Sequence, residues 1–449
     1  MAQEQVRFAI LGAGISGLAT SYHLEHRDAV LYEATDHYSG HVHSETRDGF
    51  TWDDGPHISF TVNEYVRDLF AQFVDDEYEE VHANPSNYYQ GHWIAHPAQT
   101  HLYQVPEPLR TQCLESFLGS RKQTGDPANY QEWLEQSMGP VFASTFPAAY
   151  TRKYWTTEPA NLDTDWVGIR VLKPEVDDVV NGAKGPLDRS TYYVASRPAR
   201  YPTRGGFMSY THKMAADADI RYRMKLERIN FARRWMGFAD GSESTYEQVV
   251  STIPLPRLIE ASEDAPDSVR SAAAMLRCTN FLRVDVAAKH PSRREEQWMY
   301  VYDEDKLSVR ISTTERFSPN NAPAGKTGIQ VEVYGSEYRS VPTDHAEVER
   351  RVVDELVEMG LLDGRDAVES VRITFVPQGN PIFDLDRRDA MAEISSYLDE
   401  VGVLLAGRYA EWKYLMTDAC VISARRVAGA LTGQSVDLDD QGVAISRQG

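Results

Sequence analysis

The sequence predicts an α/β fold in which a discontinuous, Rossmann-like domain carries a mainly helical insertion and an antiparallel β domain. The chain opens with a compact βαβ unit, made of a buried strand at Val6–Leu11, a helix at Ser16–His26 and a strand at Ala29–Tyr32. The pattern of Leu109–Phe146 is mostly helical, whereas Cys278–Tyr334 contains several strand-like runs. At 449 residues the chain is long enough for two or three domains, each with its own core.

The domains are expected to be interleaved, because the sequence contains no repeat, no low-complexity tract and no long linker. We assign 1–85, 203–275 and 390–449 to the Rossmann-like domain, 86–202 to the helical insertion and 276–389 to the antiparallel β domain. The β domain is expected to cover the substrate.

Periodicity and turn residues predict further elements in the middle of the chain. Helical patterns cover Asn63–Phe73 and Ala346–Met359. Ile220–Thr252 alternates like a small antiparallel sheet with a turn at Asp240-Gly241. The stretch Tyr88–Pro108, rich in aromatic residues, His and Pro, resembles short strands and turns that line a cavity.

Composition limits the possible partners and compartments. The formal net charge of -21 and the pI near 5.1 repel polyanions, which argues against nucleic acid and anionic membranes as partners. Three cysteines, Cys113, Cys278 and Cys420, form no CxxC pair and suit a reducing, cytoplasmic setting. No apolar run approaches membrane-spanning length, so a soluble protein is expected.

The strongest functional motif is the glycine turn of the opening unit. Gly12-Ala13-Gly14-Ile15-Ser16-Gly17 fits G-x-G-x-x-G, in which the glycines permit a tight turn, approach of backbone to a pyrophosphate, and helix-on-strand packing. Ser16 lies in the first turn of the helix, whose N-terminus attracts phosphate. Glu33 ends the second strand 21 residues after Gly12, where its carboxylate can bind a ribose diol.

The segments after this motif favour FAD over NAD. A second glycine segment, Ser39-Gly40-His41, follows Glu33 shortly, as in FAD enzymes of the amine oxidase class. Val401–Ala406 is a continuous apolar run that predicts a strand, which passes through Gly407-Arg408 into a helix at Asp418–Ala430 and returns to the flavin. No residue is spaced for an obvious covalent link, so FAD is expected to be bound non-covalently.

Three ordered blocks resemble the UDP-galactopyranose mutase family of flavoenzymes. The first is Gly55-Pro56-His57-Ile58-Ser59-Phe60-Thr61, followed by Asn63-Glu64; the second is Tyr150-Thr151-Arg152-Lys153-Tyr154-Trp155; the third is Gly407-Arg408-Tyr409-Ala410-Glu411-Trp412-Lys413-Tyr414. The intervening segments, including Tyr201–Gly206 and Ser251–Pro254, are equally similar to protoporphyrinogen oxidase and amine oxidase relatives.

This resemblance implies roles for individual residues. His57 and Ile58 would lie against the flavin, and Gly40, His41, Gly407, Arg408 and Asp418 would also contact the cofactor. Tyr150 and Trp155 would lie beside a nucleotide, Arg310 and Arg408 on its diphosphate, and Tyr414 near a phosphate oxygen. His57, Arg310, Arg408 and Tyr414 would then form the catalytic set. A mobile-loop arginine of the family corresponds to Arg170, Arg197 or Arg200.

The sequence departs from the mutase pattern at four places. His41 stands where the family has Asn, Phe60 replaces the second His of the histidine motif, Trp412 replaces a Tyr, and Met416 replaces an acid. These changes are expected to fall where a sugar would lie.

Each candidate residue also has a purely structural interpretation. His57 could cap a turn, Arg408 could pair with Glu411, and Arg310 could lie on the exposed face of a strand. Tyr150, Trp155 and Tyr414 could be core aromatics. His92, His96 and His101 could suggest a metal site, but a Pro-broken segment with no fixed carboxylate argues against one, and no metal is expected.

Two functions follow from these observations. The first is a flavin-dependent enzyme that acts on a nucleotide-linked or anionic sugar through flavin N5, with NAD(P)H as an external reductant. The second is an FAD-dependent oxidase or dehydrogenase that takes hydride from a C–N or C–H bond of a small molecule, as the amine oxidase and protoporphyrinogen oxidase relatives do.

Overall fold

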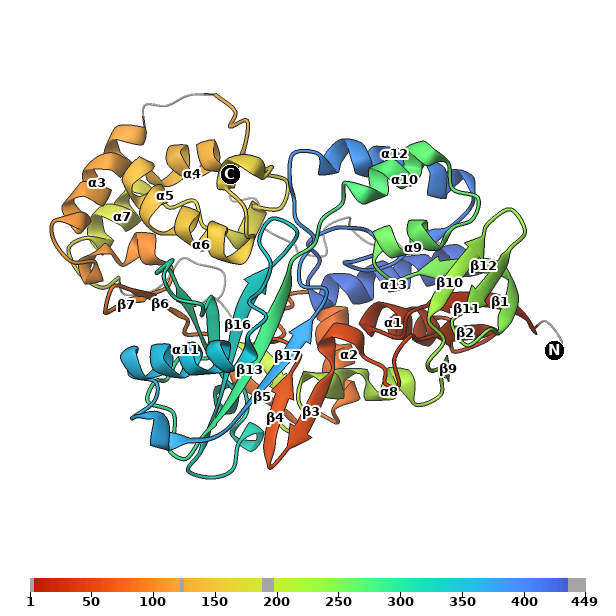
Figure 1. Ribbon diagram of the computed structural model, residues 1–449, viewed down its shortest axis with the longest axis horizontal. Helices are drawn as coiled ribbons and strands as arrows, with labels where there is room; N and C mark the ends of the chain where they lie inside the picture. Colours follow the sequence, from red (N-terminus) through yellow and green to blue (C-terminus); the bar gives the residue numbers. More distant parts are fainter. Residues whose placement is uncertain (1–3, 122–124, 188–197, 435–449) are drawn as a thin grey trace.

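The computed structural model describes residues 4–121, 125–187 and 198–434. Figure 1 shows a sheet with covering helices on the right, a second sheet at lower centre, and a group of helices at upper left. The α/β class expected from the sequence is confirmed.

The first sheet is assembled from distant parts of the chain. Its strand order is β10-β11-β12-β1-β2-β9, and β18 also pairs with β12. Neighbouring strands are parallel from β12 through β1 and β2 to β9, whereas β10, β11 and β12 form the antiparallel meander expected within 220–252. The strands are β1 (Glu4–Leu11), β2 (Ala29–Tyr32), β9 (Asp219–Arg221), β10 (Leu226–Asn230), β11 (Trp235–Phe238), β12 (Glu243–Ser251) and β18 (Leu404–Leu405).

Helices from both ends of the chain cover this sheet. Helix α1 (Ile15–His23) and α13 (Thr417–Thr432) contribute Leu18, Val421 and Ala424 to one core. The other helices of this half are α2 (Glu64–Phe73), α8 (His212–Ala215), α9 (Leu255–Ala261), α10 (Asp267–Ala274) and α12 (Arg387–Glu400). Helix α2 begins where expected, since the side chain of Asn63 accepts a hydrogen bond from the Val66 amide at 3.1 Å.

The second sheet has the order β17-β13-β16-β15-β14-β6-β7. All its pairs are antiparallel except β14 with β6. Helix α11 (His345–Glu358) packs against it through Val348, Val352 and Leu356 (Figure 1). The strands are β6 (Ser86–Tyr89), β7 (His92–Ala95), β13 (Asn280–Ala288), β14 (Trp298–Val301), β15 (Arg310–Thr313), β16 (Thr327–Gly335) and β17 (Val368–Val376).

The helices at upper left in Figure 1 come from one stretch of the chain. They are α3 (Leu109–Ser120), α4 (Tyr130–Met138), α5 (Pro140–Thr145), α6 (Pro147–Tyr154) and α7 (Val176–Gly182). Strands β6 and β7 lie within the range 86–202 assigned to this insertion, yet they extend the second sheet. Two small ribbons, β3 (Ser44–Arg47) with β4 (Phe50–Asp53) and β5 (Tyr78–Val81) with β8 (Ala199–Pro202), complete the strands. The domain boundaries given above remain a proposal.

The prediction of a strand at Val401–Ala406 is mostly wrong. Helix α12 continues to Glu400, and the chain then turns at Gly402 with φ +72°. Only Leu404 and Leu405 pair with β12, because the turn leaves them as the first residues in register with Val250 and Ser251.

A buried ionic cluster joins the second sheet to the β3–β4 ribbon. Arg283 on β13 is 1% exposed and donates to Asp285 at 3.0 Å, to Glu45 at 3.1 Å and to Asp54. Its guanidinium also donates to the Asp53 carbonyl at 3.2 Å. The charge of Arg283 is compensated by these carboxylates, although its Nε has no hydrogen-bond partner among the described residues, and loss of the arginine would remove the cation at the centre of the cluster.

We expect Arg283→Leu to lower the free energy of unfolding by about 3 to 5 kcal/mol, because it removes the buried cation of the cluster and leaves the buried Asp285 carboxylate with Arg47, at 3.5 Å, as its remaining cationic contact among the described residues. The matched control is Arg372→Leu, since Arg372 also pairs with Glu45, at 3.3 Å, but has a 49% exposed side chain. The control should cost about 0 to 1 kcal/mol. Urea unfolding of both variants measures the difference, and equal losses would contradict the role given to the cluster.

Candidate functional site

The glycines of the turn between β1 and α1 have two different roles. Two of them are required by close packing within the protein, and one lies next to open space. Gly12 has φ +95°, and a Cβ there would lie 2.6 Å from Thr252 Oγ1. A Cβ on Gly17 would lie 2.0 Å from the Gly12 carbonyl oxygen, so these two glycines are required by packing. Gly14 differs, since the nearest atom to its Cβ would be Gly40 Cα at 3.8 Å. The protein itself does not require a glycine there, which fits a backbone that is approached by a cofactor pyrophosphate.

The N-terminus of α1 has the properties of an anion site. Gly14 provides no side-chain cap, and the first turn contains no acidic residue. Ser16 is buried beneath the return of the chain, because a Cβ on Gly407, which has φ +93°, would lie 2.0 Å from Ser16 Oγ. Glu33 Oε2 accepts a hydrogen bond from the Ala13 amide at 2.9 Å, which places its carboxylate beside the turn.

The second glycine segment lies directly against the first. Gly40 has φ +53°, and its Cβ would be 3.1 Å from Gly14 Cα. The neighbouring His41 hydrogen-bonds through Nε2 to the Gln378 carbonyl and packs on Tyr409 with ring centroids 4.7 Å apart. Burial lowers the pKa of His41.

The remaining cofactor candidates are His57, Ile58 and Asp418. His57 donates through Nδ1 to the Gly55 carbonyl at 2.8 Å, and burial lowers its pKa to about 4, so the ring is neutral at pH 7. Ile58 packs against the core of the first sheet. Asp418 lies in the first turn of α13, where burial raises the pKa of its carboxyl group against a hydrogen bond from Thr61.

The structure corrects the pairing considered for Arg408. Its Nε donates to the Leu415 carbonyl at 2.7 Å and its Nη1 to Asn380 Oδ1 at 2.8 Å. Glu411 instead accepts from Lys413 at 3.0 Å and from Ser423. Arg408 does not pair with Glu411, because that carboxylate points toward α13 rather than toward the guanidinium.

Arg310 is engaged by the protein itself. Its Nε and Nη2 form a fork on Glu332, at 2.5 and 2.8 Å, and Glu332 is 1% exposed. The pairing follows from sheet register, since Arg310 on β15 faces Glu332 on β16. The exposed-strand interpretation of Arg310 is therefore wrong, and its charge is largely compensated.

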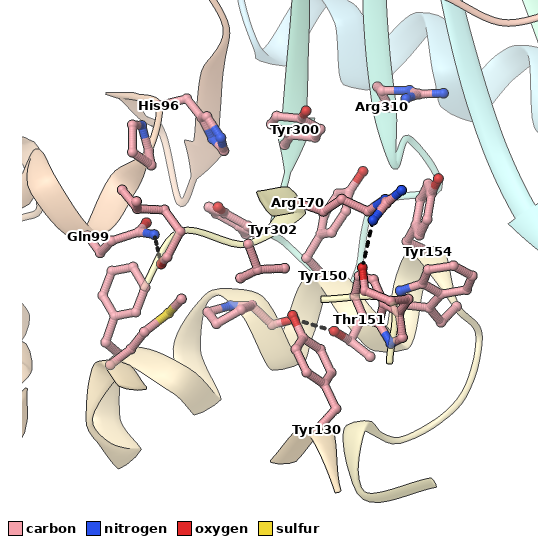
Figure 2. A pocket seen from close by; sticks show the side chains of 18 of the residues that line it. His96, Gln99, Tyr130, Tyr150, Thr151, Tyr154, Arg170, Tyr300, Tyr302 and Arg310 are labelled. Atoms are coloured by element: carbon pink, nitrogen blue, oxygen red, sulfur yellow. Dashed lines mark hydrogen bonds between the residues drawn. The ribbon is translucent and has the colours of Figure 1, made fainter. Parts of the chain in front are cut away.

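A cavity of about 190 Å³ lies between the helical group and the second sheet. Figure 2 shows Tyr130, Tyr150, Thr151 and Tyr154 on the helical side, with His96, Tyr300 and Arg310 on the side of the strands. The lining is dominated by aromatic side chains: Tyr130, Phe142, Tyr150, Tyr154, Trp155, Trp166, Tyr300, Tyr302 and Tyr414. His96, Pro97 and Gln99 confirm the expectation that the segment 88–108 lines a cavity.

The charged groups of this cavity are cationic. Among the described residues that line it there is no aspartate or glutamate, whereas Arg170 and Arg310 do line it. The guanidinium groups of Arg170 and Arg408 both lie over the ring of Tyr414, at 4.4 and 4.9 Å from its centroid. Arg310 is paired with Glu332, whereas the guanidinium groups of Arg170 and Arg408 meet at Tyr414.

The aromatic candidates meet in this cavity rather than in a distant core. The rings of Tyr150 and Tyr154 stack with centroids 5.6 Å apart, and the Tyr150 hydroxyl has no hydrogen-bond partner among the described residues. Trp155 contacts Tyr414 edge-on at 6.0 Å. Lys153, in the same block, donates to the carbonyls of Val301, Asp303 and Ser308 at 2.7 to 2.9 Å and thereby ties α6 to the second sheet.

Two of the three candidates for the mobile-loop arginine are among the described residues, and they lie in different places. Arg170 lies on the cavity and donates to the carbonyls of Trp166, at 3.1 Å, and Tyr414. Arg200 is on β8, over the ring of Tyr78 at 4.1 Å, and does not line the cavity. Arg197 lies outside the described residues.

The departures from the mutase pattern do not all fall near the cavity. Trp412 is buried in the core of the first sheet with Leu255 and Val403, so the expectation that it lies at the sugar is wrong. Phe60 packs edge-on against Trp298 at 6.1 Å, and Met416 is partly exposed just before α13.

His96 belongs to a hydrogen-bond network. Asn87 donates to the carbonyls of Ile94 and Ala95, so its Oδ1 is the acceptor for Tyr302, at 3.0 Å, and His96 Nδ1, at 3.1 Å. Within the described ranges, no group of three or more His, Cys, Asp or Glu side chains is arranged to hold a metal ion.

Burial lowers the pKa of His96 to about 3. As the pH falls from 7 to 5, the unfolded chain takes up a proton on His96 that the folded protein does not bind. The free energy of unfolding should therefore fall by on the order of 2 kcal/mol through this group. His96→Asn should flatten this dependence in urea unfolding at the two pH values, and a slope equal to that of the unmodified protein would contradict the assignment.

Several residues at or next to the cavity carry no motif of their own. Tyr300 and Tyr302 line the cavity from the end of β14, whereas Glu332 and Asn380 contact the lining residues Arg310 and Tyr154. Tyr154 itself was part of the second block only. Their meeting depends on strand register and on the docking of the helical group.

Comparisons with known proteins agree with this geometry. The sequence model of the family described as "Flavin containing amine oxidoreductase" matches residues 15–432. The chain belongs to this family.

No helix of the described residues is long and apolar enough to cross a membrane.

Solved structures of related fold carry different activities. A crystal structure of reduced UDP-galactopyranose mutase has a TM-score of 0.89 at 20% identity, with 98% of each chain covered. A protein of Exiguobacterium sp. 255-15, named provisionally as a protoporphyrinogen oxidase, gives a TM-score of 0.72 at 16% identity and covers 97% of this chain and 100% of its own. A putrescine oxidase double mutant gives 0.63 at 12% identity, covering 96% and 100%. Proteins named as a mutase and as oxidases therefore share this fold.

Proposed function

We propose that this family member is a flavin-dependent enzyme of the UDP-galactopyranose mutase-like group, acting on a nucleotide-linked or otherwise anionic sugar. FAD would be held non-covalently by the turn at Gly12, Gly14 and Gly17, by Glu33 and by the start of α13. The open space at Gly14 and the uncapped N-terminus of α1 support this assignment. When bound, FAD supplies N5 as the reacting position for the substrate.

The observation that carries the proposal is the charge of the cavity. Arg170 and Arg408 gather at Tyr414, and the described lining contains no carboxylate. In a protein of net charge -21, such a local cationic site selects for an anionic group such as a diphosphate. Tyr150 and Trp155 would contact the attached nucleotide, and Tyr414 would donate to an anionic oxygen.

The other candidates take supporting roles in this proposal. His57 would remain neutral against the flavin, with its Nδ1 held by the Gly55 carbonyl. Arg310, forked on Glu332, would contribute its remaining N–H groups and shape the cavity rather than act as an isolated charge. We further propose a cytoplasmic location, because Cys113, Cys278 and Cys420 are all free thiols.

A second candidate function is favoured by the aromatic lining. An oxidase or dehydrogenase that takes hydride from a C–H bond needs an apolar slot facing the flavin, and the cavity provides one. A cationic amine would be disfavoured by the guanidinium of Arg170, which lines the cavity, so C–N oxidation is the weaker form of this alternative.

The redox requirement separates the two functions. UDP- and dTDP-sugars are incubated with protein reduced by dithionite or by NAD(P)H, and the sugar is analysed for isomerisation. Isomerisation only after reduction, without consumption of reductant per turnover, supports the mutase-like function. If a substrate bleaches the oxidised flavin under anaerobic conditions, the oxidase function replaces it.

A further inference from the structure

The segment Gln378–Asn380, which follows β17, lies between the cofactor side and the cavity. The Gln378 carbonyl accepts from His41, and the Gly379 carbonyl accepts from the Tyr409 hydroxyl at 2.7 Å. Asn380 is 6% exposed, and its amide side chain contacts residues from two other parts of the chain. None of the sequence motifs includes this segment.

The orientation of the Asn380 side chain is fixed by chemistry. Its Oδ1 accepts from Arg408 Nη1 at 2.8 Å, and its Nδ2 lies 2.8 Å from the Tyr154 hydroxyl oxygen. A guanidinium can only donate, so the atom facing Arg408 must be the oxygen. The Nδ2 group therefore donates to Tyr154.

This orientation sets the direction of the next hydrogen bond. Because Tyr154 accepts from Asn380, its own hydrogen is available for Tyr414, whose hydroxyl oxygen lies 3.4 Å away. Tyr414 then accepts from Tyr154, and its hydrogen is directed to the cavity that it lines. At 3.4 Å, the contact between the Tyr154 and Tyr414 hydroxyl groups is the longest of these hydrogen bonds. It should shorten when Tyr414 donates to a ligand.

Contacts of the backbone fix the position of Asn380. Its amide donates to Thr279 Oγ1 at 2.8 Å, and Thr279 is fully buried. A Cβ on Gly379 would lie 2.5 Å from the same Oγ1, so the segment fits closely against Thr279. Asn380 is thus held before any ligand binds.

We propose that Asn380 is a positioning residue that directs a hydrogen-bond chain from Arg408 through Tyr154 to Tyr414. The chain makes the Tyr414 hydroxyl a donor to an acceptor oxygen in the cavity, beside the guanidinium groups of Arg170 and Arg408. The identity of this oxygen as part of an anionic nucleotide rests on the proposed function, whereas the direction of the chain does not.

The decisive variant is Asn380→Asp, which keeps the shape but has no donor. Its carboxylate accepts from both Arg408 and Tyr154, so the Tyr154 hydrogen turns away from Tyr414. Tyr154→Phe removes the same contact without changing Asn380 and serves as the reference. All proteins are compared as FAD-loaded holoenzymes with matched flavin content.

The first readout needs no ligand. Tyr414 is replaced by isotopically labelled tyrosine, and its C–O stretch is recorded by infrared difference spectroscopy. The band should shift in Asn380→Asp to the position seen in Tyr154→Phe, because both variants remove the hydrogen bond that Tyr414 accepts. A folded Asn380→Asp protein with an unshifted band would overturn the proposal.

The second readout uses UDP as the probe in calorimetric titration. Asn380→Asp should weaken UDP binding by about 10- to 100-fold, the factor expected for one hydrogen bond to a charged group. In a Tyr414→Phe background the same change should cost much less, and additive effects would overturn the action through Tyr414. Absence of UDP binding in the unmodified protein would refute the proposed function, while the infrared band still decides the direction of the chain.

Discussion

The Gly14→Val variant is expected to purify as a folded but colourless protein. A Cβ at Gly14 would lie 3.8 Å from its nearest neighbour outside the adjacent residues, Gly40 Cα, and the φ of -70° is accessible to any residue. It would, however, occupy the space where the α1 N-terminus meets the cofactor pyrophosphate. The protein should release FAD on denaturation, and the variant should lose nearly all of it, as measured by absorbance after heating and by circular dichroism for the fold.

The control for this prediction is Gly17→Val. Its Cβ would lie 2.0 Å from the Gly12 carbonyl oxygen, so β1 and α1 could not pack and folding itself should fail. A yellow Gly14→Val protein, or one that cannot fold, would remove the pyrophosphate from this turn. An unmodified protein that is colourless and cannot be reconstituted with FAD would refute the cofactor assignment altogether.

Loss of the Arg408 guanidinium is expected to weaken UDP binding by about 2 to 5 kcal/mol, because a buried charged contact to the nucleotide is removed. Arg408→Ala should keep its fold and its FAD, although it leaves Asn380 Oδ1 and the Leu415 carbonyl without their donor. Arg408→Lys should recover little, since an ammonium group cannot present the planar fork. Calorimetric titration of UDP into proteins with matched flavin content gives the comparison.

Arg310→Ala provides the contrast. It would leave the buried carboxylate of Glu332 uncompensated, so its main effect should be a loss of stability rather than of affinity alone. Equal UDP affinities in Arg408→Ala and the unmodified protein would show that Arg408 serves only to hold Asn380 and Leu415.

The cofactor half of the site could be predicted from local sequence. The turn at Gly12–Gly17, the acid Glu33 and the return at Gly407 each depend on a few neighbouring residues, and glycine spacing reports their backbone geometry directly. Helix α2 was visible for the same reason, since its cap and its apolar face lie within one short segment.

The cavity half could not be predicted in the same way. The fork of Arg310 on Glu332 depends on the register of β15 with β16, which periodicity does not specify. Asn380 and Tyr154 come from a loop and a helix that meet only after the domains dock. Helix α12 is not predicted by the sequence pattern, although Ala390, Ile394 and Leu398 are spaced four residues apart, because most of its surface is polar and the apolar run that follows it fits a strand.

Strand β18, near the C-terminal end of the described chain, pairs with β12 in the first sheet, and this arrangement has a consequence for biosynthesis. β18 joins β12 only after residue 405 has been made, and Gly407 and α13 then cover Ser16 and α1. During translation, nearly 400 further residues must therefore be synthesised before the core of the N-terminal βαβ unit is fully buried. A ribosome-stalled chain that stops before α13 should be protease-sensitive at α1 and unable to capture flavin, so we expect the cofactor to bind only after α13 has been made.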